Sequence, residues 1–206
     1  MILINSMAKI PYEPKNFENL AGVKGFSEQL LKNHFLLYQG YVANTNKLIE
    51  ALDTLLKENK TGTPEFAELK RRLGWEFNGM RLHEYYFSNM SNKVKELDRN
   101  SEFFREIIEY FGSYEAWEKD FKSVGLMRGI GWVILYYDRE AKRFFNIWIN
   151  EHDVAHLSGA VPILVMDMFE HAFMMDYGLK KSDYIESFFK VIDWVVVVKR
   201  FKGALR

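Results

Sequence analysis

The feature that most constrains the fold is a long run of apolar side chains at helical spacing, over residues 27–57. They recur mostly at intervals of three and four residues, so they share one face of an α-helix. The members of this stripe are Leu30, Leu31, His34, Phe35, Tyr38, Tyr41, Val42, Leu48, Leu52 and Leu55. The pattern predicts a single helix of about eight turns.

A second helix is predicted directly after the first. The chain breaks at residues 59–62 (NKTG), and Thr63 followed by Pro64 is typical of an N-cap and first helical position. Helical character continues to about Met90. Two long helices joined by a short break imply an antiparallel hairpin.

The pattern changes after the polar stretch 91–100. Ser101 and Ser113 resemble N-caps of two shorter helices. Three strands are then predicted at 131–137, 143–149 and 162–165, and helical spacing returns at 168–177 and 183–201. We therefore expect an α+β fold, with an N-terminal helical-hairpin domain (1–95) and a C-terminal α+β domain (96–206) that holds a small three-stranded antiparallel sheet.

Charge and cysteine content narrow the function classes. Lys plus Arg equals Asp plus Glu, at 28 each, so no net field favours nucleic acid or an anionic membrane. The chain has no cysteine, which excludes disulfides and thiolate metal sites. Residues 1–15 carry too short an apolar patch for a secretory segment, and no apolar run is long enough to span a bilayer. We expect a cytoplasmic protein with no nucleic-acid or membrane partner.

Five histidines are the candidates for chemistry: His34, His83, His152, His156 and His171. His34 lies on the apolar stripe of the first helix, and His83 is expected on the buried side of the second. Taken alone, each fits a core histidine with a hydrogen-bond partner better than a metal ligand. Two imidazoles from facing helices strengthen the ligand interpretation, because both need partners once buried.

Asp167 and His171 form the sharper signal. They lie four residues apart at the start of a predicted helix, directly after the apolar run 162–166. An aspartate carried inward there is costly unless it is paired or bound to a metal. The alternative is an N-capping aspartate and a surface histidine. With His34 and His83, the set of three imidazoles and one carboxylate suits iron, manganese or zinc, and by itself it names no reaction.

Several motifs resemble the iron/manganese superoxide dismutases. Residues 167–172 (DMFEHA) are similar to that family's D-x-[WF]-E-H-A signature. Further similar segments follow the family's order: 41–46 (YVANTN), 78–83 with 89–90, 129–132 (GIGW) and 193–194 (DW). The resemblance implies the disproportionation of superoxide to oxygen and hydrogen peroxide, an antioxidant reaction, at one iron or manganese ion per subunit. It implies that His34, His83, Asp167 and His171 are the protein ligands, with water or hydroxide as the fifth.

The same resemblance implies roles for residues around the ligands. Tyr41 would gate the substrate channel, and His152 would bind the metal-held solvent. Glu170 would reach across to His171 of a partner subunit, giving a homodimer or tetramer. Lys181 would steer superoxide toward the site. Tyr38 and Trp132 would lie next to the ligands.

A spacing and several residues depart from the family pattern, including Met80 where a histidine or other polar residue is common. His34 and Tyr41 are seven residues apart instead of eight. Tyr38 replaces a histidine, Met174 replaces a tyrosine, and Phe169 stands where many members have tryptophan. We expect slower or pH-shifted catalysis from these changes.

Other functions compete with this interpretation. The main alternative is a metalloprotein of the same fold with weak or no dismutase activity, in a metal-binding or interaction role. A di-iron carboxylate bundle requires Glu-x-x-His pairs, which the sequence lacks. A zinc protease motif fails because Phe87 occupies the position of its second histidine. The sequence does not choose iron over manganese, or dimer over tetramer.

Overall fold

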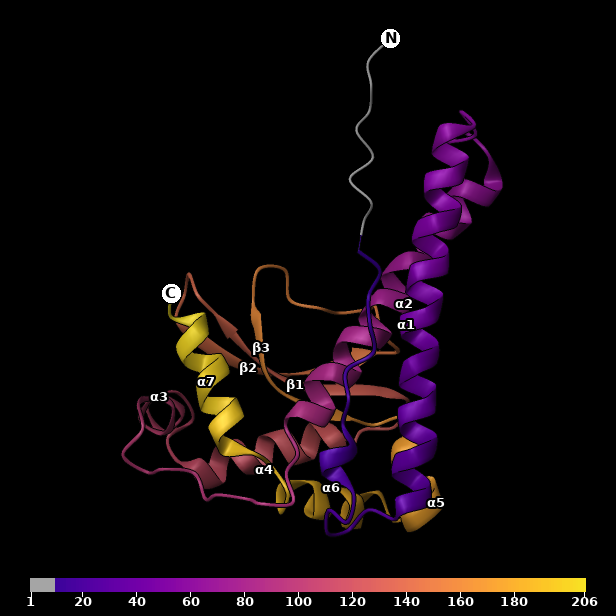
Figure 1. The fold of residues 1–206 in the computed structure, drawn as a ribbon. Coiled ribbons are helices and arrows are strands. Elements are labelled where there is room, and N and C mark those ends of the chain that lie inside the picture. The colour runs from indigo at the N-terminus through magenta and orange to yellow at the C-terminus, as the bar shows by residue number, and fades with distance from the viewer. Residues whose placement is uncertain (1–9) are drawn as a thin grey trace.

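The computed structural model describes residues 10–206. Helices α1 (Glu28–Lys57) and α2 (Pro64–Ser88) lie side by side as a hairpin that extends beyond the rest of the fold (Figure 1). The side chain of Ser27 accepts a hydrogen bond from the Leu30 amide and begins α1, and Thr63 does the same for α2 from the Phe66 amide. The predicted hairpin is therefore confirmed.

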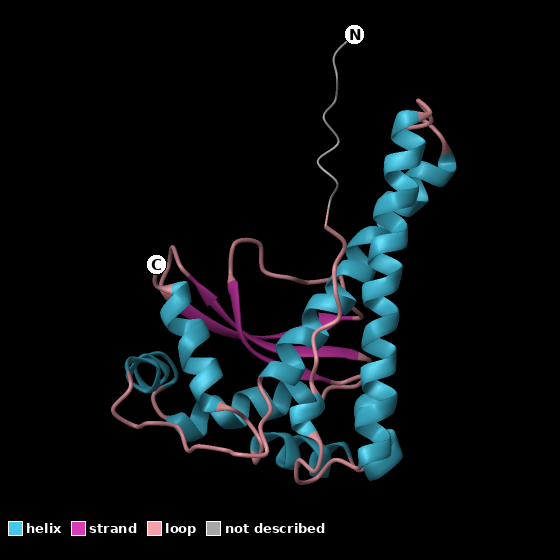
Figure 2. Ribbon diagram, in the orientation of Figure 1, coloured by secondary structure: helices cyan, strands magenta, loops and turns pink. Residues whose placement is uncertain are grey.

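The second half of the described chain contains one three-stranded antiparallel sheet (Figure 2). Its strands β1 (Gly131–Asp138), β2 (Arg143–Asn150) and β3 (Val161–Asp167) are ordered β2-β1-β3. Trp132 on β1 pairs with Asp167 on β3. This register brings the end of β3 next to the start of β1.

Helices surround the sheet. Helix α4 (Tyr114–Gly125) packs against β1 and β2, and α2 packs against β3 together with α7 (Trp194–Ala204). Helix α3 (Glu102–Phe111) packs on α4 and α7. Ser101 and Ser113 cap α3 and α4, as predicted. The contact of α2 with β3 places the helical hairpin directly over the strand that carries Asp167.

The helical segments predicted near the C-terminus are more interrupted than expected. The 168–177 segment divides into η2 (Glu170–Ala172) and α5 (Met174–Tyr177), separated by Phe173 with φ −144°. The 183–201 segment divides into α6 (Lys181–Phe189) and α7, because Asp193 accepts from the Val195 and Val196 amides and begins a new helix. Residue spacing indicated helix but missed these local caps.

The α+β fold class is confirmed, and the domain division near residue 95 stays a prediction. A short 3₁₀ turn, η1 (Glu18–Leu20), precedes α1. The interpretation of residues 1–15 falls partly on 1–9, which lie outside the described residues. Within residues 10–206, every helix is too short or too polar to span a bilayer.

Candidate metal centre

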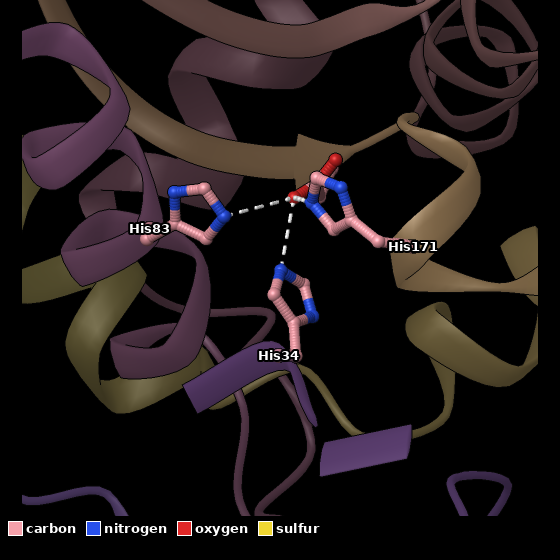
Figure 3. Close-up of side chains that lie close together, drawn as sticks. His34, His83 and His171 are labelled. Atoms are coloured by element: carbon pink, nitrogen blue, oxygen red, sulfur yellow. Dashed lines mark hydrogen bonds and ion pairs between the residues drawn. The ribbon is translucent and has the colours of Figure 1, made fainter. Parts of the chain in front are cut away.

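Four side chains from four elements meet between the hairpin and the sheet. His34 comes from α1, His83 from α2, Asp167 from the end of β3 and His171 from η2. One nitrogen or oxygen atom of each lies within 4.8 Å of those of the other three. Figure 3 shows the rings of the three histidines pointing toward one place. The structure thus brings together all four residues predicted as ligands.

The Oδ2 atom of Asp167 lies at the centre of this group. It is 3.2 Å from His34 Nε2, 3.2 Å from His171 Nε2 and 3.6 Å from His83 Nε2. Asp167, His34 and His83 are buried, while 28% of the His171 side chain is exposed. Of these four residues, solvent therefore reaches only His171.

The tautomer of His83 tests whether a cation fits here. Its Nδ1–H donates to the Gly79 carbonyl oxygen at 2.5 Å, so Nε2 carries the lone pair. That Nε2 is fully buried, has no hydrogen-bond partner within residues 10–206 and faces a carboxylate oxygen. Two electron-pair donors facing each other in a dry site are unfavourable unless a cation lies between them. Ligand atoms held about 2.1 Å from one ion lie roughly 3 to 4 Å apart, which agrees with this group.

Burial sets the charge of the site. It lowers the pKa of His34 and takes the pKa of His83 well below its usual value, so both rings are neutral and able to act as ligands. Burial alone would raise the pKa of Asp167, but the neighbouring His171 and His34 lower it below the ordinary range. The group therefore combines one carboxylate with the neutral imidazoles of His34 and His83, which suits a metal cation.

Backbone contacts hold the carboxylate in place. Asp167 Oδ1 accepts the Phe169 amide at 2.8 Å, which leaves Oδ2 facing the histidines. The Tyr184 hydroxyl on α6 donates to the Asp167 carbonyl oxygen at 2.6 Å. Asp167 is thus held by the turn after β3 and by α6 in addition to its contacts with the histidines.

Next to the four residues lies a hydrogen-bonded chain of Trp132, His152 and Tyr41. The Trp132 Nε1–H donates to His152 Nδ1 at 3.0 Å, so His152 carries its proton on Nε2. His152 Nε2 lies 2.8 Å from the Tyr41 hydroxyl oxygen and donates to it. Burial lowers the pKa of His152 to about 4, so the ring is neutral near pH 7. Tyr41 also stacks on His83, with ring centroids 5.2 Å apart.

Sequence comparison decides the family. Residues 99–200 match the family described as iron/manganese superoxide dismutases, C-terminal domain. A superoxide dismutase [Mn] of Haloferax volcanii is 32% identical over 200 residues, which cover 97% of this chain and 98% of that protein. A superoxide dismutase [Fe] of Cupriavidus metallidurans is 35% identical over 192 residues, covering 90% and 93%. The superoxide dismutase [Fe] of Aquifex pyrophilus is 32% identical over 199 residues, covering 94% and 92%.

This chain belongs to the iron/manganese superoxide dismutase family. The family resemblance is confirmed, and the four-residue group is one that could hold the iron or manganese of such a dismutase. The assignment of each residue to a role stays a prediction.

In this dismutase, Gly79 leaves room for the Tyr41 ring and contributes no side chain. A Cβ placed on Gly79 would lie 2.6 Å from Tyr41 Cδ1 and 2.7 Å from Tyr41 Cε1. The Tyr41 ring therefore packs directly on the α2 backbone. Any longer side chain at position 79 would displace it, which leaves His152 as the polar residue beside Tyr41.

Tyr38 has a hydrogen-bond partner that sequence reasoning missed, Glu84. Its hydroxyl accepts the Lys15 amide at 2.9 Å and donates to Glu84 Oε1 at 3.1 Å. Glu84 is buried and pairs with Lys15 Nζ at 2.8 Å and with Arg81 at 2.7 Å. Burial raises the pKa of Tyr38 to about 12. Nothing in the residue spacing links positions 38 and 84.

Trp75 was also missed. Its ring centroid lies 4.5 Å from that of His152 and 5.5 Å from that of Tyr41, and the Arg72 guanidinium lies 3.7 Å from the indole centroid. Trp75, Gly79 and His83 are spaced four residues apart, so they share a face of α2. That spacing was the available signal that Trp75 lies on the same side of α2 as His83.

The remaining predicted residues lie at the exposed side of the site. Glu170 is exposed, next in the chain to His171, and no residue of 10–206 accepts from or donates to His171 Nδ1. Lys181 Nζ donates to the Met127 carbonyl oxygen at 2.9 Å and lies within electrostatic reach of Glu170. Burial lowers the pKa of Lys181. Phe169 stacks between His152 and His171, at 4.7 and 5.2 Å.

Proposed function

We propose that this chain is a superoxide dismutase whose metal is held by His34, His83, Asp167 and His171. The observation that carries the proposal is the buried lone pair of His83 Nε2, which faces the Asp167 carboxylate without a proton between them. Membership of the dismutase family supports the same conclusion.

The reaction consumes two superoxide anions and two protons and yields oxygen and hydrogen peroxide. A bound iron or manganese ion would supply the one-electron oxidation of the first superoxide and the reduction of the second. The protein's part is to bind the ion, exclude other reactants and hold protons close to the site.

Tyr41 is the proposed proton donor nearest the ligands. Because His152 Nε2–H donates to the Tyr41 oxygen, the phenolic proton of Tyr41 is not used in that bond and remains available toward the site. Burial raises the pKa of Tyr41, so the proton stays on the hydroxyl near pH 7. Both ring nitrogens of His152 are already bonded, to Trp132 and to Tyr41, so we propose that His152 acts on metal-held solvent through Tyr41.

Asp167 is the proposed anionic ligand. Its pKa is held low by His171 and His34, so it remains ionised across the pH range of most cells. An ionised carboxylate next to the substrate site favours a cation there and attracts the proton of any bound water.

We further propose assembly through the His171 side of the site. The exposed Glu170 carboxylate could bind the Nδ1–H of His171 in a partner subunit, giving a homodimer or tetramer. Exposed Met174 and Met175 follow Glu170 in the chain, and they supply apolar surface for such an interface. Lys181 would then lie beside the entrance and attract superoxide.

The cytoplasm is the proposed compartment, and residues 1–95 and 96–206 are the proposed domains. The absence of cysteine is compatible with a reducing environment. Residues 1–95 contain two of the four proposed ligands, His34 and His83, and residues 96–206 contain the other two, Asp167 and His171.

Reconstitution with iron or with manganese, followed by pulse-radiolysis measurement of superoxide decay, tests the proposal. We expect one metal ion per chain and catalysed decay. Asp167→Asn should lose both, whereas Asp153→Asn, which changes an exposed carboxylate in a nearby loop, should lose neither. Metal binding without catalysed decay would support the metal-binding alternative and refute the enzyme.

A further inference from the structure

We infer that His156 is a positioning residue that fixes the loop carrying His152, and through it the Tyr41–His152 pair. The inference rests on the proposed function for the meaning of that pair. The inference also states that this histidine anchors a strained loop to the central strand. That anchoring can be measured separately from dismutase activity.

Two short hydrogen bonds hold the His156 ring. Its Nε2 lies 2.8 Å from the His152 carbonyl oxygen, and its Nδ1 lies 2.6 Å from the Tyr136 hydroxyl. A carbonyl only accepts, so His156 Nε2 carries the proton and donates. In the neutral ring Nδ1 then accepts from Tyr136, whose pKa is raised by burial so that it keeps its proton. Both ring nitrogens are therefore used, and the tautomer is defined.

Tyr136 provides a rigid anchor. It lies on the central strand β1, paired with Phe145 on β2 and Pro162 on β3, and it is 2% exposed. A chain of hydrogen bonds thus connects the sheet, through Tyr136 and His156, to the backbone of His152. The ring of His152 is held at its other end by Trp132, also on β1.

The loop needs such an anchor because its backbone is strained. Glu151 and Ala155 adopt φ +51° and +80°, a region that residues with a side chain rarely occupy. They flank a tight turn in which the Asn150 and Val154 amides and carbonyls pair with each other. Two such residues within five positions persist only where surrounding contacts over-determine the conformation.

Besides the bonds of the buried His152 ring to Trp132 and Tyr41, a further side-chain hydrogen bond reaches the loop, and it is weaker. Trp75 Nε1–H donates to Glu151 Oε2 at 3.1 Å, but this bond is exposed to solvent. Water can replace an exposed hydrogen bond at little cost, while a buried donor or acceptor left without a partner is costly. His156 is half-buried and its Tyr136 partner is buried, so we assign the positioning role to His156 and use the Trp75 bond as the internal control.

Hydrogen exchange in the metal-loaded protein tests this assignment. The reporters are the amides of Glu151 and Val154, which donate to the carbonyls of Ile130 and Asn150. His156→Leu removes both ring bonds, and we expect these amides to exchange about tenfold faster, since losing a buried hydrogen bond lowers the cost of local opening by that order. His156→Gln keeps one donor and one acceptor and should recover most of the protection. Trp75→Phe, which removes the exposed bond and keeps an aromatic ring beside His152, should leave exchange within about twofold of wild type.

A second readout separates positioning from loss of packing. The pH profile of superoxide decay should change in His156→Leu and in Tyr136→Phe in the same direction, and His156→Gln should restore it. If His156→Leu leaves both the exchange of Glu151 and Val154 and the pH profile unchanged, the inference is wrong. If exchange accelerates in a protein that shows no dismutase activity at all, the loop anchor stands and the proposed function fails. If the amides of the sheet also exchange faster in His156→Leu, the His156→Gln variant decides between the two explanations. If protection of the Glu151 and Val154 amides does not recover in His156→Gln, the positioning role of His156 is refuted.

Discussion

Acid should destabilise this protein through His152, by an amount that follows from its surroundings. His152 is buried, and burial lowers its pKa from 6.5 to about 4. Below about pH 6.5 the unfolded chain binds a proton at this residue that the folded chain does not. The stability associated with the neutral ring is fully present above that pH and is lost as the pH falls toward about 4.

The size of this loss can be calculated. One pH unit of difference between the folded and unfolded pKa corresponds to ~1.4 kcal/mol, so going from about pH 7 to about pH 4.5 should cost about 2 kcal/mol through His152 alone. His34 and His83 also have lowered pKa values and add to the total acid effect. A variant is therefore needed to isolate the contribution of His152.

His152→Gln is the matched variant. The glutamine oxygen can accept from Trp132 and its amide can donate to Tyr41, but it does not titrate. We expect urea unfolding of metal-free protein, at fixed protein concentration, to show about 2 kcal/mol less acid destabilisation in the variant than in wild type. Removing the metal separates this effect from proton competition at the ligands. Parallel pH curves for the two proteins would refute the reasoning.

Three further predictions concern the residues around the site. Gly79→Ala should push the Tyr41 ring away from α2, because the added Cβ would lie 2.6 Å from Tyr41 Cδ1. We expect the free energy of unfolding, measured by thermal unfolding, to fall by roughly 1–3 kcal/mol and dismutase activity to be reduced. Gly74→Ala on the same helix is the control, because a Cβ there meets nothing within 4 Å. Tyr38→Phe removes a buried hydrogen bond to Glu84 and should lower the free energy of unfolding by about 1–2 kcal/mol while the bound-metal content stays at the wild-type value; a loss of metal would show that Tyr38 acts on the ligands. Lys181→Met should slow superoxide decay about two- to tenfold at low ionic strength, whereas Lys181→Arg should stay close to wild type. If Lys181→Met and wild type had equal rates at all salt concentrations, steering by this residue would be excluded.

The sequence predicted the fold and the gathering of the four central residues because each depends on a local pattern. The apolar stripe and Thr63-Pro64 define the hairpin, and Asp167 with His171 follows an apolar strand. Once α2 packs on β3, His83 must approach Asp167. At this centre, the residues selected by the local sequence pattern are the ones that tertiary packing brings together.

The contacts that spacing could not reveal join residues far apart in the chain. Tyr38 bonds to Glu84, and Tyr136 bonds to His156, in each case through a side chain whose partner is fixed only by tertiary packing. The interruption between α6 and α7 was missed for a related reason. Asp193 caps α7, and its amide donates to the carbonyl of Asn89 at the end of α2, so a contact from the other half of the chain sets that helix boundary.

The seven-residue spacing between His34 and Tyr41 accounts for the position of the Tyr41 ring. Seven residues turn a regular helix by about 700°, which returns Tyr41 to within about 20° of His34, whereas eight would leave it about 80° away. Helix α1 is α-helical without interruption from Glu28 to Lys57, so no extra residue is needed to align the two side chains. This alignment lays the Tyr41 ring on the α2 backbone at Gly79, with its hydroxyl beside His152. With Tyr41 in this position, a side chain at residue 79 of α2 would meet its ring, so glycine is needed there, and the loop after β2 supplies His152 as the partner of its hydroxyl.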